Sequence, residues 1–86
     1  MAFVKPTFNL LITNPERIFF DGDAYSLSSK NDSGPFDILP NHAHFVSLLN
    51  DTKLDVVDKD NKKISFAVAR GLISAKENKV RVFVDL

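Results

Sequence analysis

The sequence predicts an all-β protein, an antiparallel β-sandwich or flattened barrel of about nine or ten short strands. Apolar and polar residues alternate along most of the 86-residue chain, and turn signals recur at intervals of roughly 8 to 12 residues. No window of roughly a dozen residues has apolar side chains at the spacing of an amphipathic helix. A chain of this length supports one core, so we expect a single domain over residues 1–86.

The first predicted strand is marked by Phe8, Leu10 and Ile12, which lie on the same face of an extended chain. Asn14 and Pro15 end it, because proline cannot donate to a sheet ladder. The short apolar and aromatic run at residues 17–20 predicts a second strand.

A tight hairpin turn is expected at Asp21 and Gly22, because both residue types accept positive φ angles. Residues 23–30 then resume extended structure, and the polar cluster at residues 31–35 predicts a loop.

A short strand follows, in which Phe36 and Ile38 should face the core while Asp37 faces outward, and Pro40 ends it. Residues 43–49 fit a strand or a turn or two of helix. We favour the strand, because the run is short and is bounded by asparagine-containing turns.

The second half of the chain contains four more extended runs, separated by turn signals at residues 58–61, 70–71 and 77–78. These runs cover residues 53–57, 63–69, 71–76 and 79–86. In the last run Val80, Val82 and Val84 should face one side, and Arg81, Phe83 and Asp85 the other. The mixed-charge residues 58–63 are typical of a solvated hairpin tip.

Composition argues against several function classes. Eleven basic and eleven acidic residues give a net charge of zero, so no long-range field attracts nucleic acid or an anionic membrane. The chain has no cysteine and therefore no disulfide, thiol nucleophile or cysteine-based zinc site. Its three glycines, Gly22, Gly34 and Gly71, lie far apart in predicted turns and form no phosphate-binding loop.

Two histidines are the main candidates for chemistry. His42 and His44 would project from one face of a strand and could share a metal ion, with Asp37 as a third ligand, but no further ligand stands at a familiar spacing. Ser47 lies near both histidines without the context of a catalytic serine. We therefore expect no catalytic, metal or cofactor residues, and interpret the histidines as a polar pair at a corner or contact surface.

The phenylalanines raise an oligonucleotide-binding alternative, in which exposed rings stack on bases beside a basic groove. Phe8, Phe36 and Phe66 alternate with other residues as core side chains do, so we do not expect nucleic-acid binding. The residues alone predict a small all-β domain that binds a partner with its surface.

Three segments in order resemble the N-terminal β-sandwich domain of the epsilon subunit of F-type ATP synthases: FNLLITNPERIFFDGDAYSL, GPFDILPNHAHFVSLL and FAVARGLISAKENKVRVFVD. The resemblance spans residues 8–85. The positions that match the family pattern are Phe20, Gly22, Gly34, Ile38, Leu39, Pro40, His42, Ala43, Phe66, Ala67, Val68, Gly71, Asn78, Val80 and Val82.

The sequence departs from the family pattern at four positions. Asp37 stands where most members have glycine, His44 where they commonly have proline, and Arg70 where they usually have a second glycine. Pro35 occupies a position that is acidic in many members. We expect these changes to alter partner contacts and to leave the sandwich intact.

The resemblance implies a non-catalytic subunit of the rotor that binds the gamma subunit and the c-subunit ring of a proton- or sodium-translocating ATP synthase. It would lie on the cytoplasmic face of the inner (plasma) membrane as part of that complex, without direct insertion into lipid and without a cofactor. The implied c-ring contacts are Asn31, Asp32, Ser33, Gly34 and Pro35. The implied gamma contacts are Pro40, Asn41, His42, Ala43 and His44.

Typical bacterial members continue into a C-terminal helical hairpin that inhibits ATP hydrolysis and in some members binds ATP. This chain ends at Leu86, so we expect either a truncation or a short form that neither binds ATP tightly nor inhibits hydrolysis. The alternative is a free-standing β-sandwich module that binds a peptide or a glycan.

Overall fold

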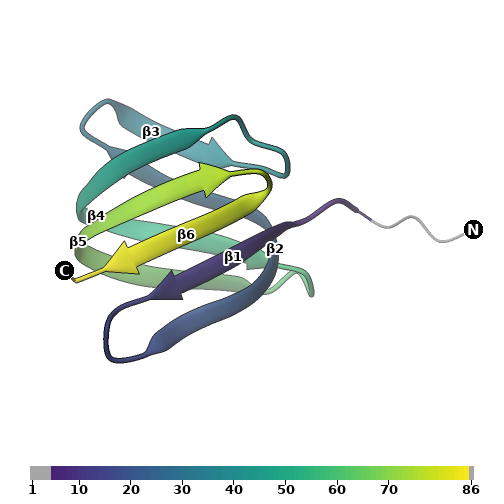
Figure 1. Ribbon diagram of the computed structural model, residues 1–86, viewed down its shortest axis with the longest axis horizontal. Coiled ribbons are helices and arrows are strands. Elements are labelled where there is room, and N and C mark those ends of the chain that lie inside the picture. Colours follow the sequence, from purple (N-terminus) through teal and green to yellow (C-terminus); the bar gives the residue numbers. More distant parts are fainter. Residues whose placement is uncertain (1–4, 86) are drawn as a thin grey trace, which may run out of the picture.

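A computed structural model describes residues 5–85 and contains six strands and, in that range, no helix (Figure 1). Residues 5–85 therefore contain no helix that is long and apolar enough to cross a membrane. The all-β prediction is confirmed. The strands are β1 (Phe8–Thr13), β2 (Ile18–Asn31), β3 (Gly34–Ile38), β4 (Phe45–Asp58), β5 (Lys63–Lys76) and β6 (Lys79–Val84).

The predicted count of nine or ten strands is wrong, because β2, β4 and β5 are each 14 residues long and bend through positions where turns were expected. Asp21 and Gly22 lie inside β2, where they pair with residues of β1 instead of forming a hairpin. Residues 43–49 are a strand from Phe45 onward, as expected, but β4 continues past Asp51, whose φ of 45° marks a kink.

Gly71 also lies inside a strand and not in the predicted turn. A Cβ atom at this position would lie 2.7 Å from the backbone oxygen of Phe83 and 3.3 Å from a methyl carbon of Val68. The glycine therefore permits close approach of the β5 and β6 backbones.

The strands close into a barrel-like sheet in the order β1-β6-β5-β4-β2, with β2 pairing back to β1, and β3 extends from the far end of β2 (Figure 1). All pairs are antiparallel except β1 and β6, which are parallel. A closed ring with an odd number of strands cannot alternate direction throughout, so one pair must be parallel. The sheet is therefore antiparallel, as expected, except at this one pair.

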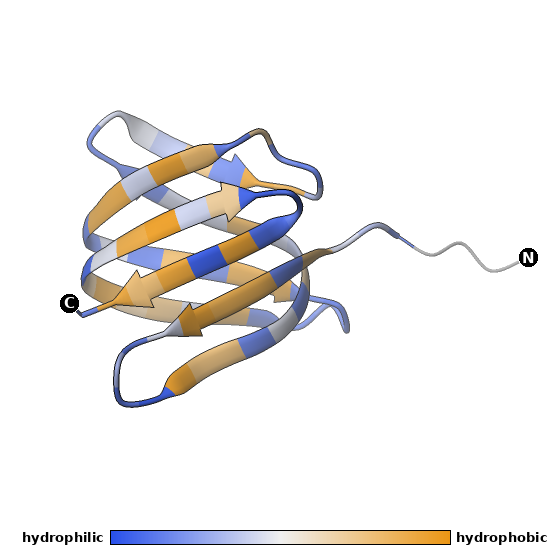
Figure 2. Cartoon of the chain, viewed as in Figure 1, coloured by the Kyte–Doolittle hydropathy of each residue, from blue (hydrophilic) through white to orange (hydrophobic). Residues whose placement is uncertain are grey.

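The core lies inside this closed sheet and follows the predicted alternation, visible as bands of apolar and polar residues along the strands (Figure 2). The faces predicted for β1, β3 and β6 are confirmed: Phe8, Leu10, Ile12, Ile38, Val80, Val82 and Val84 are all buried. Phe36 and Phe66 pack against this core half-buried. No polar or charged side chain of the described residues is buried.

The two hairpin turns of the second half are where the sequence places them. Asn61 in the tip between β4 and β5 has a φ of 63°, and Glu77 and Asn78 between β5 and β6 have φ angles of 53° and 61°. Two consecutive positive φ angles are the geometry of a two-residue hairpin turn, and asparagine tolerates this region better than most residues.

Candidate functional site

The corner at residues 40–44 connects β3 to β4 and begins with a tight turn. Pro40 and Asn41 are its central residues, the amide of His42 donates to the carbonyl oxygen of Leu39 at 3.1 Å, and Asn41 has a φ of 62°. Proline followed by a residue with positive φ is the signature of a type II turn. β3 ends at Ile38, so the prediction that the strand stops at Pro40 is confirmed.

Asn78 ties this corner to the rest of the sheet. The backbone amide of Asn41 donates to Oδ1 of Asn78, and Nδ2 of Asn78 donates to the backbone oxygen of Thr7, each at 2.8 Å. The backbone oxygen of Asn78 accepts from the amide of Asn9 at 3.1 Å. A residue distant in sequence therefore fixes the corner, and sequence reasoning missed this role although Asn78 lies in one of the recognised motifs.

His42 is half-buried at the corner, and His44 is exposed. Nδ1 of His42 lies 2.7 Å from the backbone oxygen of Ala43, so Nδ1 carries the hydrogen and Nε2 is left for an external partner. The His42 ring meets the edge of Phe45 at a centroid distance of 5.7 Å, and Phe45 packs on Phe36 at 5.0 Å. The ring is thus held by packing as well as by a hydrogen bond.

The chemistry considered for the histidines does not match this geometry. Residues 41–44 are not a strand, so the strand geometry that would place His42 and His44 on one face does not apply. Nowhere in residues 5–85 do three His, Cys, Asp or Glu side chains gather at metal-binding distance. Ser47 accepts from Nδ2 of Asn31 at 2.9 Å and donates to the backbone oxygen of Leu48 at 3.1 Å, instead of pairing with a histidine.

Two lysines lie beside His42. Lys76 and Lys79 are directly opposite each other across the β5–β6 hairpin, both exposed. They line a small gap in the packing together with His42, Leu39 and Asn78. Two positive charges therefore lie near the histidine, with the exposed Glu77 in the turn between them.

The loop predicted at residues 31–35 is shorter in the structure, because Asn31 ends β2 and Gly34 and Pro35 begin β3, so that only Asp32 and Ser33 form the turn. This segment lies at the other end of β3 from the corner (Figure 1). Asn31 stabilises it, because its Oδ1 accepts from the amide of Ser33 at 2.9 Å, and Gly34 has a φ of 120° that disfavours other residues. Asp32, Ser33 and Pro35 are exposed. The two predicted contact segments therefore lie at opposite ends of β3.

Asp37 faces outward as expected, and the structure explains its presence. It pairs across the sheet with Ser28, whose hydroxyl donates to Oδ1 of Asp37 at 2.6 Å. A cross-strand hydrogen bond to a carboxylate stabilises the β2–β3 hairpin in a way that the glycine of the family pattern cannot.

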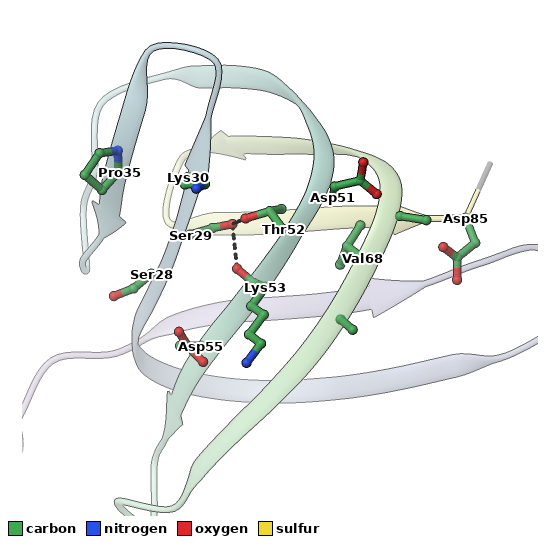
Figure 3. Close-up of a pocket in the computed structure, with 12 residues that line it drawn as sticks. Ser28, Ser29, Lys30, Pro35, Asp51, Thr52, Lys53, Asp55, Val68 and Asp85 are labelled. Atoms are coloured by element: carbon green, nitrogen blue, oxygen red, sulfur yellow. Dashed lines mark hydrogen bonds between the residues drawn. The ribbon is translucent and has the colours of Figure 1, made fainter.

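An open groove of about 940 Å³ lies next to the loop at residues 31–35 (Figure 3). It forms where β2 diverges from β4 beyond their last register pair, Ser28 with Asp55. Ser29 spans the divergence, because its hydroxyl donates to the backbone oxygen of Lys53 at 2.7 Å. The other residues that line it are Lys30, Pro35, Asp51, Thr52, Ala67, Val68, Ala69 and Asp85. Sequence reasoning missed this groove, because no local motif encodes the divergence of two strands.

Comparison with known proteins shows which family the chain belongs to. Residues 7–86 match the family described as the ATP synthase delta/epsilon chain β-sandwich domain. The chain belongs to this family. It is 37% identical over 79 residues to an ATP synthase epsilon chain of Campylobacter fetus, and 31% identical over 78 residues to one of Protochlamydia amoebophila.

The chain spans only about half to three fifths of the length of those relatives. The matches include 92% and 91% of this chain but 61% and 53% of the two epsilon chains. A chain of the Euglena gracilis mitochondrial ATP synthase structure, described as OSCP/F1/c-ring, has a TM-score of 0.85 at 15% identity, over 96% of this chain and 53% of its own length. A chain from the Tetrahymena thermophila central stalk and c ring gives 0.74 at 16% identity, over 93% and 63%. At these identities the two structures support the family fold alone.

Proposed function

We propose that this protein is a non-catalytic central-stalk subunit of a proton- or sodium-translocating F-type ATP synthase, which binds the gamma subunit and the c ring and helps to transmit torque. The observation that supports it most strongly is the family match over residues 7–86. The role needs no catalytic residue, cofactor or metal. It places the protein at the cytoplasmic face of the membrane, as a peripheral part of the complex that neither inserts into lipid nor binds nucleic acid.

In this proposal the corner at residues 40–44 contacts the gamma subunit. Torque transmission needs an interface that does not rearrange, and hydrogen bonds to Asn78 and packing on Phe45 hold the corner in one conformation. Nε2 of His42 is available for a polar contact. Lys76 and Lys79 face each other, which is unfavourable in the free chain, so a carboxylate of gamma placed over them would relieve the repulsion.

The c ring contacts the loop at residues 31–35 in the same proposal. Its exposed tip, Asp32 and Ser33, is held by the Asn31 cap and by the hairpin beneath it. The location of this loop at the opposite end of β3 from the gamma corner lets one small domain contact two partners at once.

Co-purification with gamma tests the corner. We expect His42→Ala to weaken retention of co-expressed gamma by roughly five- to thirtyfold, the effect of losing a contact of about 1–2 kcal/mol. Lys62→Ala is the matched control, because Lys62 is exposed in the hairpin tip away from the corner. Equal retention of gamma by both variants would contradict the proposed contact.

The open groove supports a second candidate function, that of a free-standing module that binds a peptide or a glycan. It is large enough for a short ligand and offers polar side chains from two strands, β2 and β4, and from Asp85. Two results together would favour this alternative. The chain would fail to co-purify with gamma and the c ring, and it would bind a member of a peptide or glycan array. Thr52→Trp, which fills the groove, would abolish that binding.

A further inference from the structure

The outer part of the β2–β3 hairpin extends beyond the strand pairing that joins it to the barrel. Among the described residues, the register pairs between β2 and β4 end at Ser28 with Asp55. Beyond that point β2 remains paired with β3, as far as Asn31 with Gly34. We call residues 29–36 the arm, because they leave the barrel as a two-stranded unit.

Burial changes abruptly where the arm begins. Leu27 and Ile38 are paired with each other at its base, and both are 0% exposed. No side chain of residues 29–36 is buried, and only Phe36 packs against the core, half-buried. The groove of about 940 Å³ is lined by arm residues on one side and by β4 and β5 on the other (Figure 3). Apolar burial therefore anchors the base of the hairpin far more firmly than the arm.

Hydrogen bonds from two side chains hold the arm against β4. The hydroxyl of Ser29 donates to the backbone oxygen of Lys53 at 2.7 Å near the base (Figure 3). Nδ2 of Asn31 donates to Oγ of Ser47 at 2.9 Å near the tip. A two-stranded hairpin is marginally stable by itself in water, so an arm that loses these bonds would also fray.

An aromatic contact joins the arm to the corner at residues 40–44. Phe36 of the arm packs on Phe45 with ring centroids 5.0 Å apart. The same Phe45 ring meets His42 of the corner at 5.7 Å, with the two rings nearly perpendicular. Phe45 therefore contacts both predicted contact segments, and movement of Phe36 removes one of the two rings that position it.

We propose that the arm moves about the Ser28–Asp55 pair between a closed and an open position, and that Phe45 couples this movement to the His42 ring. When the arm is closed, Phe36 holds Phe45 and Phe45 holds His42. When it is open, the His42 ring turns more freely.

The consequence of this coupling rests on the proposed function. A c ring that binds the closed arm more tightly than the open one would order His42 for its contact with gamma. Because coupling between two binding sites is reciprocal, gamma bound at the corner would favour the closed arm by the same factor. Each partner would then strengthen the binding of the other.

Amide hydrogen exchange of the purified chain, followed residue by residue by NMR, tests the movement. Ser47→Ala removes the hydroxyl that accepts from Asn31. We expect amides of residues 29–36 to exchange roughly three- to tenfold faster, the effect of losing one such hydrogen bond, while β1 and β6 exchange as before.

Thr13→Val is the matched control for this measurement. It also removes one hydroxyl, which donates to the backbone oxygen of Arg17 at 2.9 Å in the turn between β1 and β2. It should leave exchange in the arm unchanged. The moving arm is overturned if Ser47→Ala does not speed exchange there, or if it speeds exchange equally in β1 and β6.

The chemical shifts of the His42 ring protons test the coupling. In the closed arm these protons lie close to the Phe45 ring, whose ring current displaces their shifts. Phe36→Leu keeps an apolar side chain in the arm but removes the ring. We expect the His42 shifts to move toward those of an exposed histidine, for which His44 is the internal reference. Phe66→Leu is the control, because it makes the same change at a half-buried phenylalanine of β5.

His42 shifts that are unchanged in Phe36→Leu, or that move equally in Phe66→Leu, would overturn the coupling. Both measurements use the isolated chain and need neither gamma nor the c ring. Their failure would leave the proposed stalk function standing, and a failure of gamma to bind would leave the movement of the arm standing.

Discussion

At the scale of single residues, function rests on side chains that hold other groups in place. Asn78 reaches from the β5–β6 turn to the backbone of Asn41 and Thr7, so one amide fixes the orientation of the predicted gamma contact. Asp37, which looked anomalous in the sequence, is accounted for by its bond to Ser28. Neither role could be predicted locally, because each partner lies in another strand or turn.

Replacing Asn78 separates its two contributions to stability. Asn78→Ala loses both side-chain hydrogen bonds. It also places alanine at a φ of 61°, a left-handed conformation that alanine tolerates less well than asparagine or glycine. We therefore expect the free energy of unfolding to fall by about 2–4 kcal/mol. Asn78→Gly loses the same bonds but tolerates the φ, and should cost about 1 kcal/mol less. Urea denaturation of both variants measures this. Identical losses would contradict a contribution from the backbone conformation.

At the scale of strands, the sequence predicts faces well and strand ends poorly. The faces of β1, β3 and β6 followed directly from period-two alternation, because burial on one side of a sheet imposes that pattern. The breaks expected at Asp21 and Gly22 and at Arg70 and Gly71 do not exist. Gly71 permits close approach of two backbones, whereas Gly22 has no such close neighbour, and a sequence cannot distinguish either case from a turn glycine.

Glycine-to-alanine substitutions test this reading of the long strands. Gly71→Ala puts a Cβ 2.7 Å from the Phe83 backbone oxygen, which cannot move without breaking the β5–β6 ladder, so we expect a loss of about 1–3 kcal/mol in stability. Gly22→Ala is the matched control, because its Cβ would meet no atom closer than 3.9 Å. We expect its stability to change by less than about 1 kcal/mol. Thermal unfolding that ranks the two variants in the opposite order would contradict the close-approach explanation.

At the scale of the whole molecule, closure of the sheet determines where the groove and the two predicted contact segments lie. The alternation predicts a sandwich or barrel, but the pairing of β1 with both β2 and β6, and the groove where β2 leaves β4, depend on contacts between residues far apart in sequence. The same closure puts the loop at residues 31–35 and the corner at residues 40–44 at opposite ends of β3. The proposed rotor function requires this separation, since each segment must reach a different partner.

Site-specific cross-linking in the assembled complex tests that requirement most directly. Ser33 and Ala43 are exposed, one in each segment, and Lys62 in the hairpin tip is an exposed control. With a short cross-linker, Ser33→Cys should be joined to the c subunit, Ala43→Cys to gamma, and Lys62→Cys to neither. Products of Ser33→Cys and Ala43→Cys that contain the same partner, or neither partner, would contradict the account.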